Sequence, residues 1–380
     1  MQLDLTILPG DGIGPEVTEQ AVLVLQTVAG AFGHQLSLQH KNIGGAALTA
    51  VNDPLPEDTI QACLSASAVL LGAVGSPAFD HYPNHLRPEN GLLRLRRELG
   101  AFANLRPAIC FPALEDCSPL RADIVRGTDI LIVRELLGGL YFGKPRSIEG
   151  PAGSRTALNT MSYDEPAVES IARIAFDLAG RRRKQLLSVD KANVLECSRL
   201  WREVVTRVAK DYPAVKLLHM YVDSAAMSLV QRPTDFDVVL TENMFGDILS
   251  DQAGGIVGSL GLLASASIGG PVGLYEPVHG SAPDIAGKGL ANPLGAILSA
   301  AMLLRYSFQL EREAMCIEKA VGLVLDKGFR TADLAHGRPA VSTSEMGRKL
   351  SEAVTDLAGA LLQLPQDQPP KHQAPKEKTA

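Results

Sequence analysis

The hydrophobic residues of this chain fall into two patterns that alternate along its length. Short apolar runs rich in branched side chains are typical of buried strands, and stretches with apolar residues every three or four positions are typical of amphipathic helices. The runs predict strands at residues 3–8, 68–74, 102–107, 129–135, 186–191, 217–222 and 236–240. The periodic stretches predict helices that include residues 17–28, 89–99, 168–178, 201–208, 294–308, 314–325 and 342–364. This alternation predicts an α/β protein.

Charged side chains stand at or just after the ends of four predicted strands. Arg134 and Lys191 end two of the runs, and Asp223 follows a third. The fourth run leads into a segment that carries Asp247 and Asp251. In open α/β sheets, ligands bind beyond the carboxyl ends of the strands. Several charged strand ends together therefore favour one shared site more strongly than any of them alone.

Asp247 and Asp251 are four residues apart, which places both carboxylates on one face of a helix. On spacing alone, a solvated helix face is the more common explanation. A pair of aligned carboxylates also suits a divalent metal, which prefers oxygen ligands. The further carboxylate at Asp223, the lysine at a strand end and the nearby arginines make a shared metal and substrate site the better interpretation.

Three glycine-rich or proline-rich segments interrupt the periodic pattern. The turn at 9–16 has the spacing G-x-G-x-G followed by proline, so it does not match the G-x-G-x-x-G dinucleotide fingerprint and is explained nearly as well by a tight turn. The loops at 75–88 and 276–293 are long and aperiodic, which is typical of binding segments. Residues 144–163 resemble a hairpin or a projecting arm.

Composition restricts the classes of function. The 380 residues are 46% hydrophobic and 21% charged, with a net charge of −6, which argues against a nucleic-acid partner bound through a basic surface. No apolar run is long enough to cross a membrane, and the N-terminus lacks the pattern of a signal peptide. Five widely spaced cysteines without a CxxC motif indicate core residues in a reducing compartment, so we expect a cytoplasmic protein. The polar tail at 365–380 is expected to be disordered.

Taken together, the segments resemble the isocitrate/isopropylmalate β-decarboxylating dehydrogenases over residues 3–364. The resemblance is carried by residues 8–17, 104–107, 133–135, 141–143, 188–195, 221–223, 243–251 and 276–293. It implies a two-domain fold with a large mixed sheet flanked by helices, which is not a Rossmann fold. It also implies a discontinuous cofactor-binding domain at 1–101 plus 258–364. Residues 102–257 would then form a domain for substrate, metal and dimerisation, with the arm at 144–163.

The reaction that the resemblance implies is the NAD-dependent oxidative decarboxylation of (2R,3S)-3-isopropylmalate to 4-methyl-2-oxopentanoate and CO₂, a step of leucine biosynthesis. A related enzyme that acts on D-malate, tartrate or homoisocitrate is the alternative in the same class. A non-catalytic regulatory subunit is the alternative in another class. Such a subunit is expected to lack some of the catalytic lysine, tyrosine and aspartates, and all of them are present here.

The same resemblance assigns roles to the charged residues. The substrate carboxylates would be bound by Arg96, Arg106 and Arg134, whose planar guanidinium groups can each donate two parallel hydrogen bonds. The ligands around Mg²⁺ or Mn²⁺ would be Asp223, Asp247 and Asp251. Lys191 would be the base that takes the hydroxyl proton, and Tyr141 would be the acid that protonates the enol carbon. Without the resemblance, a packed aromatic in a turn would be the simpler interpretation of Tyr141.

Lys191 and Asp223 reach the site from the partner subunit in this family, so the resemblance implies a homodimer with shared active sites. It also implies a cofactor loop formed by His279, Gly280, Ser281, Ala282, Asp284, Ile285 and Asn292. A carboxylate at Asp284 would accept hydrogen bonds from the ribose hydroxyls and repel a 2′-phosphate, which favours NAD over NADP. The substrate side chain would contact Glu89, Leu92, Leu93 and Val194, and their three apolar side chains suit an isopropyl group.

Overall fold

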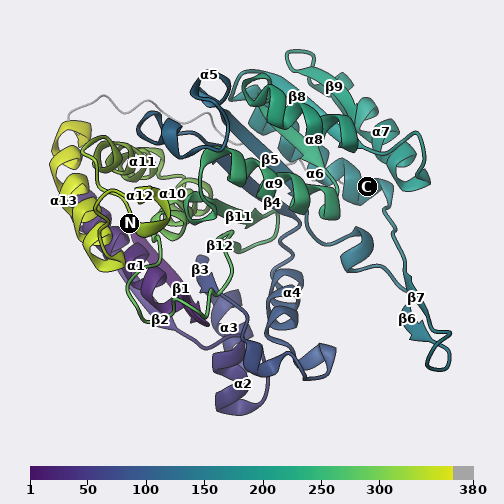
Figure 1. The fold of residues 1–380 in the computed structure, drawn as a ribbon, viewed down its shortest axis with the longest axis horizontal. Coiled ribbons are helices and arrows are strands. Elements are labelled where there is room, and N and C mark those ends of the chain that lie inside the picture. The colour runs from purple at the N-terminus through teal and green to yellow at the C-terminus, as the bar shows by residue number, and fades with distance from the viewer. Residues whose placement is uncertain (363–380) are drawn as a thin grey trace, which may run out of the picture.

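The computed structural model describes residues 1–362, and a single large mixed sheet runs through the whole molecule (Figure 1). The sheet has ten strands in the order β2-β1-β3-β12-β11-β4-β5-β10-β8-β9. These strands are β1 (Gln2–Gly10), β2 (Gln35–His40), β3 (Ala68–Ala73), β4 (Ala103–Ile109), β5 (Asp129–Glu135), β8 (Gln185–Asp190), β9 (Lys216–Tyr221), β10 (Val238–Thr241), β11 (Ala264–Ile268) and β12 (Gly273–Pro277). The predicted α/β fold with a large mixed sheet is confirmed.

The direction of the strands reverses across the middle of the sheet. The four strands from β2 to β12 are parallel to one another, and so are the four from β5 to β9. Three successive antiparallel pairings, through β11 and β4, separate these two blocks. The blocks therefore run in opposite directions. The carboxyl ends of β5, β8, β9 and β10, which lead to Arg134, Lys191, Asp223 and Asp247, therefore lie at one edge of the sheet, and the glycine turn at the end of β1 lies at the opposite edge.

Helices cover both faces of the sheet (Figure 1). They are α1 (Gly14–Phe32), α2 (Gly45–Val51), α3 (Glu57–Ser65), α4 (Pro88–Glu98), α5 (Ala122–Val125), α6 (Glu165–Gly180), α7 (Glu196–Val208), α8 (Val222–Gln231), α9 (Asn243–Val257), α10 (Leu294–Phe308), α11 (Glu311–Asp326), α12 (Ala332–Ala335) and α13 (Thr343–Leu362). One face carries α1, α10, α11 and α13 over the first block and α6 and α7 over the second. The other face carries α3 and α4 over the first block and α8 and α9 over the second.

Strand β5 shows how the second block is buried on both faces. Leu131 and Val133 pack into the core under α6 and α7, whereas Ile130 and Ile132 pack under α8 and α9. Successive side chains of a strand point to opposite faces, so a continuous apolar run is required when helices cover both. This explains why the run at 129–135 has no polar alternation and why its end, at Arg134, lies deep inside the molecule.

The segment predicted to be an arm forms a separate two-stranded sheet of β6 (Arg146–Glu149) and β7 (Thr156–Asn159). It projects away from the body of the molecule (Figure 1). Ile148 and Leu158 are exposed on it, by 71% and 48%. Within this chain, these two apolar side chains of the arm are therefore left largely uncovered.

Three strands escaped the sequence analysis, namely β2, β11 and β12. β2 is an edge strand with few buried residues, β11 is made mostly of alanine and serine, and β12 begins with glycine and ends with proline. The helices and the other strands that were predicted agree with the structure to within a few residues, whereas the short helices α2, α3, α5 and α12 were not predicted. The predicted disordered tail lies outside the described residues, and the division into two domains stays a prediction.

No helix within residues 1–362 is both long and apolar enough to span a membrane. The five cysteines are free thiols, and four of them are buried, which agrees with their predicted role as core residues.

Candidate active site

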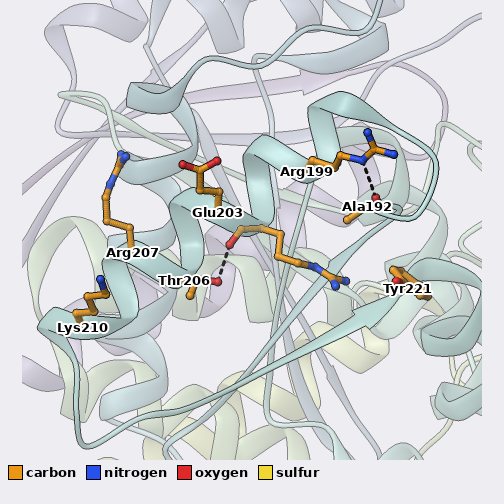
Figure 2. Close-up of a pocket in the computed structure, with 8 residues that line it drawn as sticks. Ala192, Arg199, Glu203, Thr206, Arg207, Lys210 and Tyr221 are labelled. Carbon is orange, nitrogen blue, oxygen red and sulfur yellow. Dashed lines mark hydrogen bonds between the residues drawn. The ribbon is translucent and has the colours of Figure 1, made fainter.

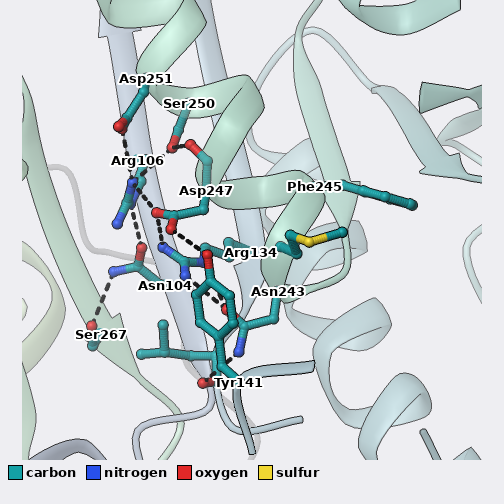
Figure 3. Close-up of polar contacts among 12 residues, drawn as sticks. Asn104, Arg106, Arg134, Tyr141, Asn243, Phe245, Asp247, Ser250, Asp251 and Ser267 are labelled. Atoms are coloured by element: carbon teal, nitrogen blue, oxygen red, sulfur yellow. Dashed lines mark hydrogen bonds and ion pairs between the residues drawn. The ribbon is translucent and has the colours of Figure 1, made fainter. Parts of the chain in front are cut away.

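The centre of the site is built where α9 crosses β4 and β5 (Figure 3). Glu242 caps the N-terminus of α9 through hydrogen bonds from the backbone N–H groups of Met244 and Phe245, so the helix begins directly after β10. A side chain at Gly246 would overlap Arg134, because a Cβ there would lie 2.6 Å from the Arg134 Cγ. The glycine therefore lets the arginine pass beneath the first turn of the helix.

Asp247 joins three of the predicted site residues in one network (Figure 3). Its Oδ1 lies 2.5 Å from Nη1 of Arg134 and 3.3 Å from Nη1 of Arg106, and its Oδ2 accepts a 2.9 Å hydrogen bond from the Tyr141 hydroxyl. Asp251 lies one turn further along and forms a 3.3 Å ion pair with Arg106. The structure therefore brings together these two arginines, two carboxylates and the tyrosine.

Two asparagines hold the arginines in place. Asn243 accepts hydrogen bonds of 3.1 and 2.7 Å from Nε and Nη2 of Arg134, and its own amide donates to the carbonyls of Leu136 and Gly138. Asn104 accepts a 2.7 Å bond from Nε of Arg106. Arg134 and Arg106 are therefore oriented before any ligand binds, which lowers the entropic cost of binding an anion.

Arg96 lies close enough to this network to add to its positive charge. Its Nη2 pairs with the buried Glu276, and its buried Nε has no hydrogen-bond partner within residues 1–362. Burial is the largest cause that lowers the pKa of Arg134, to about 10, and the charges of Arg106 and Arg96 add to it. Burial also lowers the pKa of Arg106. A cluster of buried, mutually repelling guanidinium groups with an unused donor has the chemistry that suits an anion with more than one carboxylate.

The carboxylates and the tyrosine respond to this field in different ways. Burial raises the pKa of Asp247, but Arg134 and Arg106 outweigh it and hold that pKa below its usual range. Burial raises the pKa of Asp251. Burial, and then the hydrogen bond to Asp247, raise the pKa of the Tyr141 phenol, so it stays protonated and can donate a proton. The oxygen donors of Asp247 and Asp251 fit the chemistry of Mg²⁺ or Mn²⁺.

Lys191 and Asp223 form a second, separate pair. Nζ of Lys191, just after β8, lies 2.8 Å from the Asp223 carboxylate in the first turn of α8. This hydrogen bond lowers the pKa of Asp223. Strand β10 lies between β8 and the strand that carries Arg134. Within residues 1–362 of one chain, no three acidic, histidine or cysteine side chains meet in a metal-binding group, so Asp223 does not join Asp247 and Asp251 there.

The predicted cofactor loop packs against the glycine turn that follows β1. The N–H of Ile13 donates to the Ser281 carbonyl at 2.8 Å, and a Cβ on Gly12 would lie 1.9 Å from that same oxygen. Asp284 is exposed. The Nδ1 of His279 lies 3.0 Å from the Gly280 carbonyl, its buried Nε2 has no partner, and burial lowers its pKa. The glycine turn therefore supports the loop.

The side chain of Asn292 is already engaged within the chain. Its amide donates to Asp333, and its carbonyl oxygen accepts from the Leu294 N–H at the start of α10. The second amide hydrogen, the second lone pair of the carbonyl oxygen and the backbone of Asn292 are left for the predicted contact with adenine. Sequence reasoning gave no role to Asp333, because nothing in its local pattern indicates that α12 lies beside this loop.

The predicted residues for the substrate side chain are divided between two places. Glu89, Leu92 and Leu93 are on α4. Gly75 lies between Glu89 and Ser281, because a Cβ built on Gly75 would lie 3.2 Å from Oε1 of Glu89 and 3.4 Å from Oγ of Ser281. These contacts bring Glu89 to the predicted cofactor loop. Val194 is elsewhere, in the turn after β8, where its N–H donates to the Lys191 carbonyl. It is 61% exposed.

A separate groove of about 660 Å³ lies along the outer face of α7 (Figure 2). It is lined by Ala192, Arg199, Arg202, Glu203, Thr206, Arg207, Lys210 and Tyr221. Its arginines are paired inside the chain: Arg202 donates two 2.8 Å bonds to Asp190, and Arg199 and Arg207 pair with glutamates. The guanidinium groups of this groove are therefore engaged within the chain.

Asn243, Asn104 and Glu276 are functional neighbours that the sequence did not reveal as such. All three lie inside or next to segments that stood out by their motifs, at 243–251, 104–107 and 276–293. Roles were assigned instead to the charged residues beside them. The sequence around an asparagine does not indicate which arginine it will accept a hydrogen bond from. Proximity to a recognised motif is the signal that could have found them.

Comparison with known proteins gives independent support for the resemblance to the β-decarboxylating dehydrogenases. The family model described as isocitrate/isopropylmalate dehydrogenase matches residues 4–350. The 3-isopropylmalate dehydrogenase of Priestia megaterium is 55% identical over 358 residues, which are 94% of this chain and 97% of that protein. The 3-isopropylmalate dehydrogenase of Aquifex aeolicus is 52% identical over 357 residues, which are 94% of this chain and 98% of that protein.

Solved structures agree with the sequence comparisons. The crystal structure of isocitrate dehydrogenase from Methylococcus capsulatus superposes with a TM-score of 0.83 at 35% identity, covering 93% of this chain and 99% of that one. The apo form of a β-decarboxylating dehydrogenase from Thermococcus kodakarensis gives a TM-score of 0.77 at 35% identity, covering 96% and 100%.

Proposed function

The chain belongs to the isocitrate/isopropylmalate dehydrogenase family and is a decarboxylating dehydrogenase, and from this premise we propose that it oxidises and decarboxylates 3-isopropylmalate in leucine biosynthesis. The observation that carries the proposal is the position of Asp247, which contacts two buried arginines and the Tyr141 hydroxyl. Anion-binding groups, a carboxylate able to bind a metal and a proton donor thus surround one point.

Arg96, Arg106 and Arg134 bind the two carboxylates of the substrate in this proposal. Each presents several N–H groups in one plane, and the buried Nε of Arg96 is a donor that no acceptor within residues 1–362 uses. Asp247 and Asp251 hold Mg²⁺ or Mn²⁺, which would supply positive charge at the substrate oxygens during oxidation and loss of CO₂. The hydrogen bond of its hydroxyl to Asp247 places Tyr141 at this site, which supports its role as the acid that protonates the enol carbon after CO₂ leaves.

The cofactor of the proposed reaction is NAD, which when bound would supply the acceptor for the hydride of the substrate carbon. The loop from His279 to Asn292 binds its adenosine half, and the exposed carboxylate of Asp284 favours ribose hydroxyls over a 2′-phosphate. The close packing of Gly12 on the backbone of Ser281 supports a preformed loop.

We propose that the active enzyme is a homodimer in which Lys191 and Asp223 complete the site of the partner subunit. Apolar side chains near these two residues support an interface, since Val194, Met227 and Ile248 are about 60% exposed. The same proposal assigns the arm to the interface and places residues 102–257 in one domain. Lys191 then takes the proton from the substrate hydroxyl.

The alternative substrates D-malate, tartrate and homoisocitrate differ mainly in the group that replaces isopropyl. Leu92 and Leu93 are only half-buried on α4, so an apolar group that covers them would gain roughly 1–3 kcal/mol of binding. This gain favours the isopropyl group over a hydrogen or a carboxylate.

A substrate panel tests the proposal directly. NADH formation should be fastest with 3-isopropylmalate as judged by kcat/KM, slower with D-malate, tartrate and homoisocitrate, and abolished by EDTA and restored by Mg²⁺. NADP should be a poor replacement for NAD. Absence of NADH formation with 3-isopropylmalate, or a preference for D-malate, would refute the assigned substrate.

A further inference from the structure

Tyr163 lies at the point where the chain returns from the arm to the body of the molecule. It follows β7 and directly precedes the capping residue of α6, and its ring packs edge-on against Trp201 at 5.5 Å. Its hydroxyl accepts a 3.0 Å hydrogen bond from the N–H of Asn243 and donates at 3.2 Å to Oε2 of Glu242. Tyr163 therefore touches the N-terminus of the helix that carries both site carboxylates.

The same phenol ring packs on the glycine turn that leads to Tyr141. A Cβ on Gly138 would lie 2.6 Å from a ring carbon of Tyr163, and a Cβ on Gly139 would lie 2.5 Å from its hydroxyl oxygen. The N–H of Gly139 also donates to the carbonyl of Ser162. The absence of side chains at both glycines lets the turn lie directly on the tyrosine, so the position of one fixes the position of the other.

A third connection runs from Tyr163 to Arg134. The backbone N–H of Asn243 is bound to the Tyr163 hydroxyl, and the side chain of Asn243 holds both Arg134 and the carbonyl of Gly138. Glu242 and Glu135 on either side are buried, and burial raises the pKa of each. Removing the hydroxyl would leave the Asn243 N–H without its acceptor and would take away one of the three donors to the Glu242 carboxylate, in a place that water reaches poorly.

We propose that Tyr163 is a positioning residue that fixes the Tyr141 turn, Arg134 and the start of α9 relative to one another, and so couples the base of the arm to the catalytic groups. It touches none of the atoms proposed to react. Its effect is to keep the Tyr141 hydroxyl, the Arg134 guanidinium and the Asp247 carboxylate in one arrangement. This inference rests on the roles proposed above for those three residues.

The test compares Tyr163→Phe with Tyr275→Phe. Tyr275 is buried, and its hydroxyl bonds to Ser307 on α10, so the control also loses one buried hydrogen bond. Its neighbour Glu276 points to the opposite face of β12, which keeps the control side chain away from Arg96. We expect Tyr163→Phe to lower kcat by at least about tenfold, because small misplacements of catalytic groups have large effects on rate. KM for NAD should not change, and the control should keep the kcat of the wild type.

Hydrogen exchange supplies a readout that does not depend on activity. The amides of residues 138–143 and of Asn243 should exchange faster in Tyr163→Phe than in the wild type, and Tyr275→Phe should leave them unchanged. Equal kcat in the two variants, or unchanged exchange across 138–143, would overturn the proposal. If the wild-type protein itself fails to oxidise 3-isopropylmalate, the proposed function fails, whereas the exchange comparison still decides whether Tyr163 positions these segments.

Discussion

Asp247 combines two duties that are usually separated between residues. Its carboxylate compensates the buried guanidinium groups of Arg134 and Arg106, and it is also one of the proposed metal ligands. Asp251 has only one ion pair, and its side chain is 56% exposed, compared with 32% for Asp247. The two aspartates should therefore behave alike in catalysis and differently in stability.

Asp247→Asn and Asp251→Asn should each abolish metal-dependent NADH formation. In EDTA, Asp247→Asn should also lower the free energy of unfolding by about 1–3 kcal/mol, because two buried cations lose their main counter-charge. Asp251→Asn should change it by less than about 1 kcal/mol, as expected for a half-exposed pair. Urea unfolding measures both values, and equal losses of stability would contradict the structural duty of Asp247.

Asp284 provides a second test at a single position. Replacing it with serine keeps a hydrogen-bonding group but removes the negative charge that opposes a 2′-phosphate. The ratio of kcat/KM for NADP to that for NAD should rise by about tenfold or more in Asp284→Ser. The exposed Asp80, in the loop between β3 and α4, serves as a matched control, and Asp80→Ser should leave the ratio unchanged. An unaltered ratio in Asp284→Ser would remove this residue from the cofactor site.

Among the elements, the glycine turn after β1 is the one whose role becomes clear only in the structure. Its sequence does not match the dinucleotide fingerprint and is explained nearly as well by a tight turn, and in the structure it packs on the backbone of Ser281 in the predicted cofactor loop. Gly12 has a positive φ of 57°, and no side chain fits between it and Ser281. The turn therefore acts on the cofactor through the loop that rests on it.

Gly12→Ala should push the loop away from its place and raise KM for NAD by about tenfold, with a loss of stability of about 1–3 kcal/mol. Gly30→Ala is the matched control, since Gly30 is exposed within α1 and has no atom near the added Cβ. That variant should gain about 0.5–1 kcal/mol in stability and keep its KM. Steady-state kinetics and thermal unfolding separate the two cases. If Gly12→Ala binds NAD normally, the turn does not support the loop.

Whether the sequence could predict an element depended on whether local residues or long-range pairing stabilise that element. α9 and its carboxylates could be predicted because local periodicity and a preceding apolar run determine them. β12 could not, because Gly273 and Pro277 disfavour a strand locally and its pairing with β3 and β11 supplies the order. The hydrogen bond from Arg134 to Asn243 could not be predicted either, since it depends on how α9 lies over β5.

For the whole molecule, the main question is whether one chain can form a complete site. Lys191 and Asp223 bind each other at 2.8 Å, apart from the cluster around Asp247. If a second copy brings this pair to the cluster, the loss of a residue from either side can be compensated by the intact side of the other subunit.

Mixing Lys191→Ala with Asp247→Asn tests this arrangement. Each variant alone should be inactive. After subunit exchange or co-expression, mixed dimers should contain one site with all its wild-type groups, which restores about a quarter of the wild-type activity for random pairing. A mixture of Lys191→Ala with Asp223→Asn should restore nothing, because both changes lie on the same side of the site. Activity that stays absent in the first mixture would show that each chain forms its site alone.

The strand order has a consequence for the way the chain is made. α1 packs against α10 and α13, so the first hundred residues cannot cover their apolar surface until the last helix exists. The stretch from β4 to α9, residues 103–257, is by contrast continuous and contains all the strands of the second parallel block. Since segments fold as they leave the ribosome only when their packing partners are already present, we expect the middle of this protein to fold before its beginning.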